Sequence, residues 1–241
     1  MAKIKDTIEQ ELKFALHKNY NESEILNVFG KFGKIWAKPE EGVKPADCSK
    51  YTFKDIYLDV PDLCLAKHGF SYRVRKTSYS KKLKVNYKFP GEQNDGLFVR
   101  REVRQSFKKY DNFEVNDLKN EFCEVSKLAT SFVKEHSPVK GTSSIFETLL
   151  YFSAQRKHYH LETENWGDLG TIIFETGKFH VSESASCNMK HFELEFELNI
   201  NRTCGKTLVL LDEIKSCLLE YGLIASQTNK YIRGLKLYGK L

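Results

Sequence analysis

Several features that define other classes of protein are missing from this sequence of 241 residues. No stretch approaches the ~20 consecutive apolar residues of a membrane-spanning helix, and the opening MAKIKDTIEQ lacks the apolar core of a signal peptide. We therefore expect a cytoplasmic protein with no membrane partner. The six cysteines form no C-x-x-C pair, which argues against a zinc knuckle, and we expect them to be reduced thiols.

Long repeats and low-complexity linkers are also absent, which favours one domain over residues 1–241. Apolar residues make up 41% of the chain, enough for a substantial core. Lysine and arginine number 38 against 32 acidic residues. This excess of six positive charges is too small to indicate a partner by itself, so the positions of the charges carry the argument.

The chain is rich in stretches that alternate apolar and charged residues, the pattern of strands with two different faces. The carboxylate-rich stretches are IEQELKFAL at 8–16 and HFELEFELN at 191–199. The cation-rich stretches are SYRVRK at 71–76, KLKVNYKF at 82–89, LFVRREVR at 97–104 and AQRKHYHL at 154–161. Any single one fits an ordinary antiparallel sheet with one face in water.

Taken together, these stretches predict a closed barrel with a charged interior. Like charges two residues apart repel one another unless an opposite charge lies between them. Carboxylates would hold Mg²⁺ or Mn²⁺, and arginine and lysine would hold phosphates. We therefore expect an α+β fold, an eight-stranded antiparallel β-barrel tunnel with a polar, charged lumen and helices packed outside.

The helices are expected between and after the strands. Apolar spacing predicts them within 21–33, 115–136, 144–152 and 207–223. In the second of these, Leu118, Phe122, Val125 and Leu128 form the apolar face. We expect the insert at 107–150 to cover the barrel or to form a subunit contact, which leaves a homodimer as one option.

Six blocks resemble, in order, the sequence blocks of the CYTH superfamily, the triphosphate tunnel metalloenzymes. EQELK at 9–13 is similar to the signature E-x-E-x-K of this family. The other blocks are YLDVPDLCLAKHGFSYRVRK at 57–76, YKFPGEQNDGLFVRREV at 87–103, IIFETGKF at 172–179, FELEFEL at 192–198 and NKYIRG at 229–234. Together they span nearly the whole chain.

The resemblance implies a tunnel of eight antiparallel strands that acts on triphosphates with Mg²⁺ or Mn²⁺ as cofactor. It implies these metal ligands: Glu9, Glu11, Glu193 and Glu195. It implies these phosphate-binding cations: Lys13, Arg73, Arg75, Lys88, Arg100, Arg156 and Lys230. As catalytic residues it implies Glu102 and Glu175, which would orient water, together with Lys88.

Three departures from the family pattern affect the expected site. Position 175 is Glu where many members carry Asp, and Asn229 stands before Lys230 where Ser is usual. After Arg156, a bulge would decide whether Lys157 or His158 points inward, and the sequence leaves both open.

Hydrolysis of an inorganic or organic triphosphate is the favoured function, because no segment marks an adenine pocket. ATP cyclisation by a class IV-type adenylyl cyclase is the alternative within enzymes. A non-catalytic polyphosphate- or nucleotide-binding module would tolerate loss of the metal-binding glutamates. All four of these are present: Glu9, Glu11, Glu193 and Glu195. A nucleic-acid binder would expose its cations among stacking aromatics. We expect His158 and His160 to be structural or phosphate-contacting.

Overall fold

The computed structural model describes residues 4–37, 50–80, 82–94, 96–108, 123–138, 146–182, 190–199 and 205–241. Its strands are β1 Ile4–Ala15, β2 Lys34–Trp36, β3 Lys50–Asp59, β4 Ser71–Thr77, β5 Lys82–Lys88, β6 Glu92–Asn94, β7 Leu97–Lys108, β8 Glu147–Thr163, β9 Gly167–His180, β10 Lys190–Leu198 and β11 Ile224–Ala225. Its helices are α1 Glu22–Gly30, α2 Cys64–Lys67, α3 Glu124–His136, α4 Gly205–Glu220 and α5 Lys230–Leu237.

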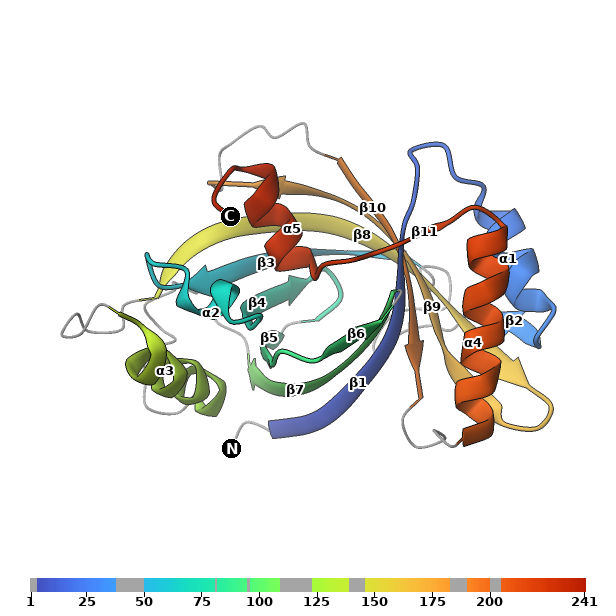
Figure 1. Ribbon diagram of the computed structural model, residues 1–241, viewed down its shortest axis with the longest axis horizontal. Coiled ribbons are helices and arrows are strands. Elements are labelled where there is room, and N and C mark those ends of the chain that lie inside the picture. Colours follow the sequence, from blue (N-terminus) through green and yellow to red (C-terminus); the bar gives the residue numbers. More distant parts are fainter. Residues whose placement is uncertain are drawn as a thin grey trace.

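Eight of the strands close into an antiparallel barrel, which confirms the predicted fold class (Figure 1). Their order is β1-β10-β9-β8-β3-β4-β5-β7, and β7 returns to β1. Strand β1 closes the barrel because it is long enough to pair with both neighbours. Its first part runs against β7, with Glu9 opposite Arg100, and its last part runs against β10, with Glu11 opposite Glu197.

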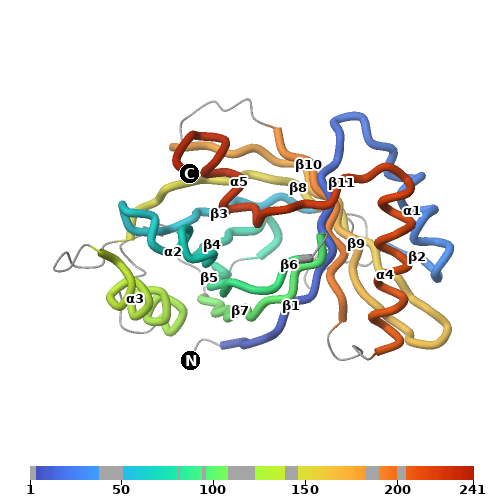
Figure 2. The backbone as a smooth tube through the Cα atoms, in the orientation of Figure 1, coloured from blue at the N-terminus to red at the C-terminus, as the bar shows by residue number. Residues whose placement is uncertain are grey.

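The apolar outer face of the barrel is buried under helices at its two ends, on opposite sides of Figure 2. At one end, α1 and α4 cover Phe14, Leu194 and Phe196. At the other end, α3 covers Tyr72 and Val85. Each such side chain contributes about 1.5–3 kcal/mol when it is fully buried, so the helices hold the barrel wall in place from outside.

Residues 144–152 are a correction to the sequence prediction, because β8 begins at Glu147 where a helix was expected. The interior of the barrel is apolar around the first residues of β8. Leu150 and Phe152 pack with Phe179 and with Tyr231 of α5. A strand that is buried on both faces loses the alternation that identifies strands, and its run of apolar residues then looks helical.

Helix α3 is shorter in its described part than the predicted span 115–136, and it starts at Glu124. Leu118 and Phe122 lie outside the described residues. Val125, Ala129 and Val133 form the buried face, whereas Leu128 is exposed. The predicted face was therefore wrong at Leu128, because small Ala129 makes the contact that a larger side chain was expected to make.

Within the described residues, no helix combines the length and the apolar character needed to cross a membrane.

Candidate active site

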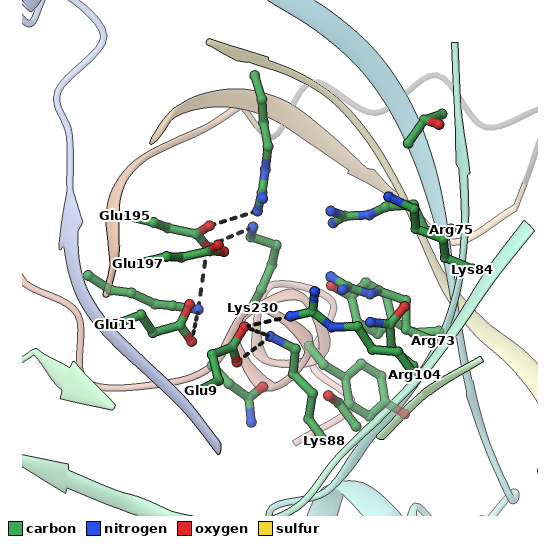
Figure 3. A pocket seen from close by; sticks show the side chains of 18 of the residues that line it. Glu9, Glu11, Arg73, Arg75, Lys84, Lys88, Arg104, Glu195, Glu197 and Lys230 are labelled. Atoms are coloured by element: carbon green, nitrogen blue, oxygen red, sulfur yellow. Dashed lines mark hydrogen bonds and ion pairs between the residues drawn. The ribbon is translucent and has the colours of Figure 1, made fainter. Parts of the chain in front are cut away.

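The barrel encloses a cavity of about 150 Å³ in which glutamates gather on one side, and Arg73, Arg75, Lys84 and Arg104 lie across from them (Figure 3). The glutamates that line it come from β1 and β10: Glu9, Glu11, Glu195 and Glu197. The cations that line it are Lys13, Arg73, Arg75, Lys84, Lys88, Arg100, Arg104, Arg156 and Lys230. Nine cations against four glutamates leave the lining with a formal excess of five positive charges.

Three of the glutamates form what we call the lumen cluster, Glu9, Glu11 and Glu197. One carboxylate oxygen from each lies within 4.8 Å of the others, and Glu9 and Glu11 are buried. The cluster exists because β1 and β10 pair Glu11 directly with Glu197, while Glu9 projects from the same face of β1. Carboxylate oxygens are the ligands that Mg²⁺ and Mn²⁺ prefer, so the residues fit a hard divalent cation.

Glu9 and Glu11 differ in their tendency to hold a proton. Burial disfavours the charge of Glu9, but Lys88 and Arg100 outweigh this and hold its pKa well below the usual range. The Lys88 Nζ lies 2.7 Å from a Glu9 oxygen, and the Arg100 Nε lies 3.0 Å from the same oxygen. Burial and the neighbouring charge of Glu9 together raise the pKa of Glu11. Glu11 is nevertheless paired with cations, because its carboxylate lies 2.8 Å from the Lys13 Nζ and accepts a 2.6 Å hydrogen bond from the Arg100 Nη2.

Glu193, a predicted metal ligand, lies in a different group, which we call the α5 cluster: Glu175, His191 and Glu193. Facing atoms of these three buried side chains lie within 4.8 Å of one another. Lys230 of α5 enters this cluster, with its Nζ in contact with Glu175 and 3.3 Å from Glu193. Glu193 does not line the cavity in the described structure.

The cations keep the α5 cluster ionised. Burial opposes charge on Glu175 and Glu193, but Lys230 lowers the pKa of both, with help from Arg156 for Glu175 and from Arg233 for Glu193. The Arg233 Nη2 donates to Glu193 over 2.6 Å. Burial lowers the pKa of His191, but hydrogen bonds to Glu175 and Glu193 outweigh it and raise the pKa overall.

Glu195 joins the two clusters along β10. Its carboxylate accepts a 2.7 Å hydrogen bond from Arg156 and lies 3.4 Å from the Lys13 Nζ. Although burial opposes its charge, Arg156 and Lys230 hold the pKa of Glu195 well below the usual range. Of the four predicted metal ligands, the structure therefore places Glu9, Glu11 and Glu195 at the cavity.

Lys230 is positioned by the start of α5. The Asn229 side chain accepts a 2.9 Å hydrogen bond from the Ile232 backbone N–H, so it caps the helix. Ser and Asn are comparable caps, so the departure from the usual Ser at this position leaves the local structure unchanged. The cap makes Lys230 the first helical residue, directed into the barrel.

The wall opposite the lumen cluster is organised by Asp55, which the sequence reasoning missed. Asp55 is fully buried and accepts two hydrogen bonds from Arg75, of 2.6 and 2.7 Å, and one of 3.3 Å from Arg73. Burial opposes its charge, but the two arginines lower its pKa. The alternation Phe53, Asp55, Tyr57 in β3 could have indicated an inward carboxylate.

The two predicted catalytic glutamates lie behind the cations and do not line the described cavity. Glu102 is fully buried and contacts Arg104. Its carboxylate accepts a 2.7 Å hydrogen bond from the Asn86 side chain and lies 3.7 Å from the Lys88 Nζ. The Glu175 carboxylate accepts a 2.6 Å hydrogen bond from the Arg156 Nε.

Three further charged residues line the cavity although they were not among the predicted site residues: Lys84, Arg104 and Glu197. Each lies two or four residues from a predicted site residue, so the alternation placed it on the charged face, whereas the family motifs did not include it.

Aromatic side chains line another part of the cavity. Tyr51 lies between Tyr79 and His158, with ring centroids 5.0 and 5.1 Å away. His158 therefore points inward. Lys157 points outward, and its Nζ lies 2.6 Å from a carboxylate oxygen of Glu22. This answers the question that the sequence left open after Arg156. His160 does not line the cavity in the described structure, and it stacks on Trp36.

The chain matches the sequence model of the CYTH domain over residues 7–209 and therefore belongs to the CYTH family. Members of this family are triphosphatases or class IV adenylyl cyclases, and they bind triphosphate substrates. No curated protein matches the chain in sequence.

Solved structures share the fold at low sequence identity. A candidate adenylate cyclase from Bacillus halodurans is similar with a TM-score of 0.58 and 16% identity, covering 95% of this chain and 97% of that one. A Pyrococcus horikoshii protein is similar with a TM-score of 0.53 and 15% identity, and the match covers 96% of this chain and 99% of that one. A candidate adenylyl cyclase from Hippeastrum, described as having a dominant triphosphatase activity, is similar with a TM-score of 0.50 and 16% identity, covering 97% of both chains.

Proposed function

We propose that this chain is a divalent-metal-dependent triphosphatase that hydrolyses an inorganic or organic triphosphate inside the barrel. The observation that carries the proposal is the charge of the cavity lining, with four glutamates on one side and nine cations around and opposite them. A triphosphate is a chain of negatively charged groups rich in acceptor oxygens, which arginine and lysine bind through charge-assisted hydrogen bonds. The glutamates would serve the metal that accompanies such a substrate.

The lumen cluster would hold Mg²⁺ or Mn²⁺, with Glu195 beside it. When bound, the ion supplies positive charge to the phosphoryl oxygens and to the leaving phosphate group. The geometry supports this assignment, because one carboxylate oxygen from each of the three glutamates lies within 4.8 Å of the others.

The cations of the opposite wall would bind the phosphate chain. Arg73 and Arg75 present planar guanidinium groups that can each donate two hydrogen bonds to one phosphate group. Because Asp55 already holds both of them, little reorganisation would accompany binding. Lys13, Lys88, Arg100, Arg156 and Lys230 would contact the remaining oxygens.

Glu102 and Glu175 are proposed to act through the cations that they contact. Glu102 would orient Lys88 and Arg104, and Glu175 would orient Lys230. A carboxylate behind a cation fixes the direction of the N–H groups, which matters most when charge develops in the transition state. Any water-orienting part that they play would follow from a change in these contacts when substrate binds.

A second candidate function is cyclisation of ATP to cyclic AMP. The observation that favours it is the aromatic group of Tyr51, Tyr79 and His158 in the cavity lining, which could stack on a nucleobase. The same group would also serve an organic triphosphate that is hydrolysed, so only the products distinguish the two reactions.

The test is product analysis with inorganic triphosphate, ATP and thiamine triphosphate, each with Mg²⁺ and with Mn²⁺. The wild type is compared with Glu11→Gln and with Glu213→Gln, a matched change at an exposed residue of α4. We expect metal-dependent phosphate release from one substrate, lost in Glu11→Gln and kept in Glu213→Gln.

Cyclic AMP and pyrophosphate from ATP would instead establish the second candidate. Tight triphosphate binding without turnover of any substrate would mean that the chain is a binding module, and the proposed hydrolysis would be wrong.

A further inference from the structure

A second hollow lies on the outside of the barrel, on the strip of wall between the two groups of helices. It has a volume of about 700 Å³ and is lined mainly by apolar atoms. It lies over five neighbouring strands, β10, β9, β8, β3 and β4. We call it the lysine groove, after the residues that line it: Lys18, Lys54, Lys76, Lys178 and Lys190.

Four of these lysines lie in one transverse row that strand register defines. Lys190 pairs with Lys178, Ser153 lies between Lys178 and Lys54, and Lys54 pairs with Lys76. At about 4.8 Å between neighbouring strands, the row spans roughly 19 Å. The four lysines are exposed.

The row concentrates positive charge without compensation. Among the residues that the structure describes, no carboxylate forms an ion pair with Lys54, Lys76, Lys178 or Lys190. Lysines that face each other directly across strands repel one another, which costs stability. An anion placed over the row would relieve this repulsion, so the surface is complementary to a chain of negative charges.

The form of the groove identifies the kind of anion. A flat membrane would touch the rim of a hollow and leave its apolar lining unfilled. Single-stranded nucleic acid binds through exposed aromatic platforms, and the aromatic side chains lining this groove are half-buried Phe192 and buried Phe53. The row beside the lysines consists of Thr176, Gln155 and Thr52, which can donate hydrogen bonds. Apolar lining, polar donors and a cationic row suit a polypeptide with mixed side chains.

We propose that the lysine groove is a docking site for an extended acidic segment of a partner protein, in which carboxylates alternate with apolar side chains. The carboxylates contact the lysine row, and the apolar side chains fill the lining beside Phe192 and the lysine stems. The strands that form the groove are already paired on both sides, so the segment binds through side chains and does not add a strand to the sheet.

The test measures binding of a fluorescently labelled ten-residue peptide that alternates glutamate with leucine. Wild type is compared with a variant carrying Lys54→Gln, Lys76→Gln, Lys178→Gln and Lys190→Gln. The control variant removes the same charge at exposed lysines elsewhere: Lys34→Gln, Lys67→Gln, Lys206→Gln and Lys236→Gln. We expect the groove variant to raise Kd at least about tenfold, with circular dichroism unchanged, and the control to change it less than about threefold.

Two altered peptides test the chemistry of the segment. Replacing glutamate by glutamine, or leucine by serine, should each weaken binding to the wild type. An equal loss of peptide affinity in the groove variant and in the control variant would show that the peptide is attracted only to the net charge of the protein. That result would overturn the proposal. No binding to the wild type, or tighter binding of a polyphosphate chain, an oligonucleotide or anionic vesicles at the same lysines, would also overturn it.

Discussion

The lumen cluster and the α5 cluster each bring three potential ligand groups together, but the cations beside them differ. In the α5 cluster, Lys230 reaches between the acids and Arg233 contacts Glu193, so the pKa values of Glu175 and Glu193 are both lowered. In the lumen cluster, Lys88 and Arg100 favour the charge of Glu9, whereas the pKa of Glu11 is raised. Both clusters are paired with cations, so what favours the lumen cluster as a metal site is its position. Its three glutamates line the cavity, whereas no member of the α5 cluster lines it in the described structure.

The largest expected effect separates the two clusters directly. Glu197→Gln should weaken Mn²⁺ binding by at least about 100-fold, because it removes a direct ligand of the lumen cluster. Glu193→Gln should weaken it less than about threefold, because Lys230 and Arg233 already neutralise that carboxylate. Isothermal titration calorimetry of both variants measures the difference. A greater loss in Glu193→Gln would return Glu193 to the metal site and reverse our assignment of the clusters.

The second effect concerns stability. Lys230→Met should lower the free energy of unfolding by about 3–5 kcal/mol, because it leaves the buried carboxylates of Glu175 and Glu193 without their shared cation. Urea unfolding followed by circular dichroism measures it, with Lys236→Met at an exposed position of α5 as control. A loss below about 1 kcal/mol would mean that Lys230 is not needed to neutralise the α5 cluster.

A third effect tests the wall opposite the lumen cluster. Asp55→Asn should raise KM about tenfold and change kcat less, because Arg73 and Arg75 lose the carboxylate that orients them toward phosphate. Steady-state kinetics with the substrate that the product analysis selects gives both constants, and Asp212→Asn, at an exposed residue of α4, is the control. An unchanged KM would show that the arginines hold their positions without Asp55.

The smallest effect is a pH dependence of stability in the metal-free protein, which has the same sign for His191 and for Glu11. The folded-state pKa of His191 is raised, so its stabilisation is complete below the usual pKa of 6.5 and is lost as the pH rises through the folded value. His191→Gln should therefore cost more stability at pH 5 than at pH 9.

Glu11 follows the same sign, because folding favours its protonated form as well. Its folded-state pKa is raised above the usual 4.5, so stability is lost as the pH rises from about 4.5 through the folded value and the carboxylate ionises. Glu11→Gln should be more stable than the wild type at neutral pH, with the difference vanishing in acid. Unfolding curves across pH 4–9 measure both variants, and a stability relative to the wild type that does not rise with pH in either variant would contradict the pKa direction assigned to that residue.

Much of the barrel was predictable because alternation is a local property. The stretch HFELEFELN assigns each residue of β10 to one face, and the structure places Leu194 and Phe196 in the outer core with Glu195 inside. The same rule failed at residues 144–152, where Leu150 and Phe152 meet α5 inside the barrel. No local pattern reveals that a distant helix will bury a second face.

The sequence by itself determined which strands carry charge, which face each charge occupies, and that acids and cations share one interior. Only the tertiary structure decided which charges are neighbours. Glu197 joins Glu11 because β1 and β10 pair in one register, and Glu193 is drawn away by Lys230 from the far end of the chain. The alternation along a strand decides whether a side chain points into or out of the barrel. Its depth inside the barrel depends on strand register and on barrel closure, which arise from pairing between distant segments.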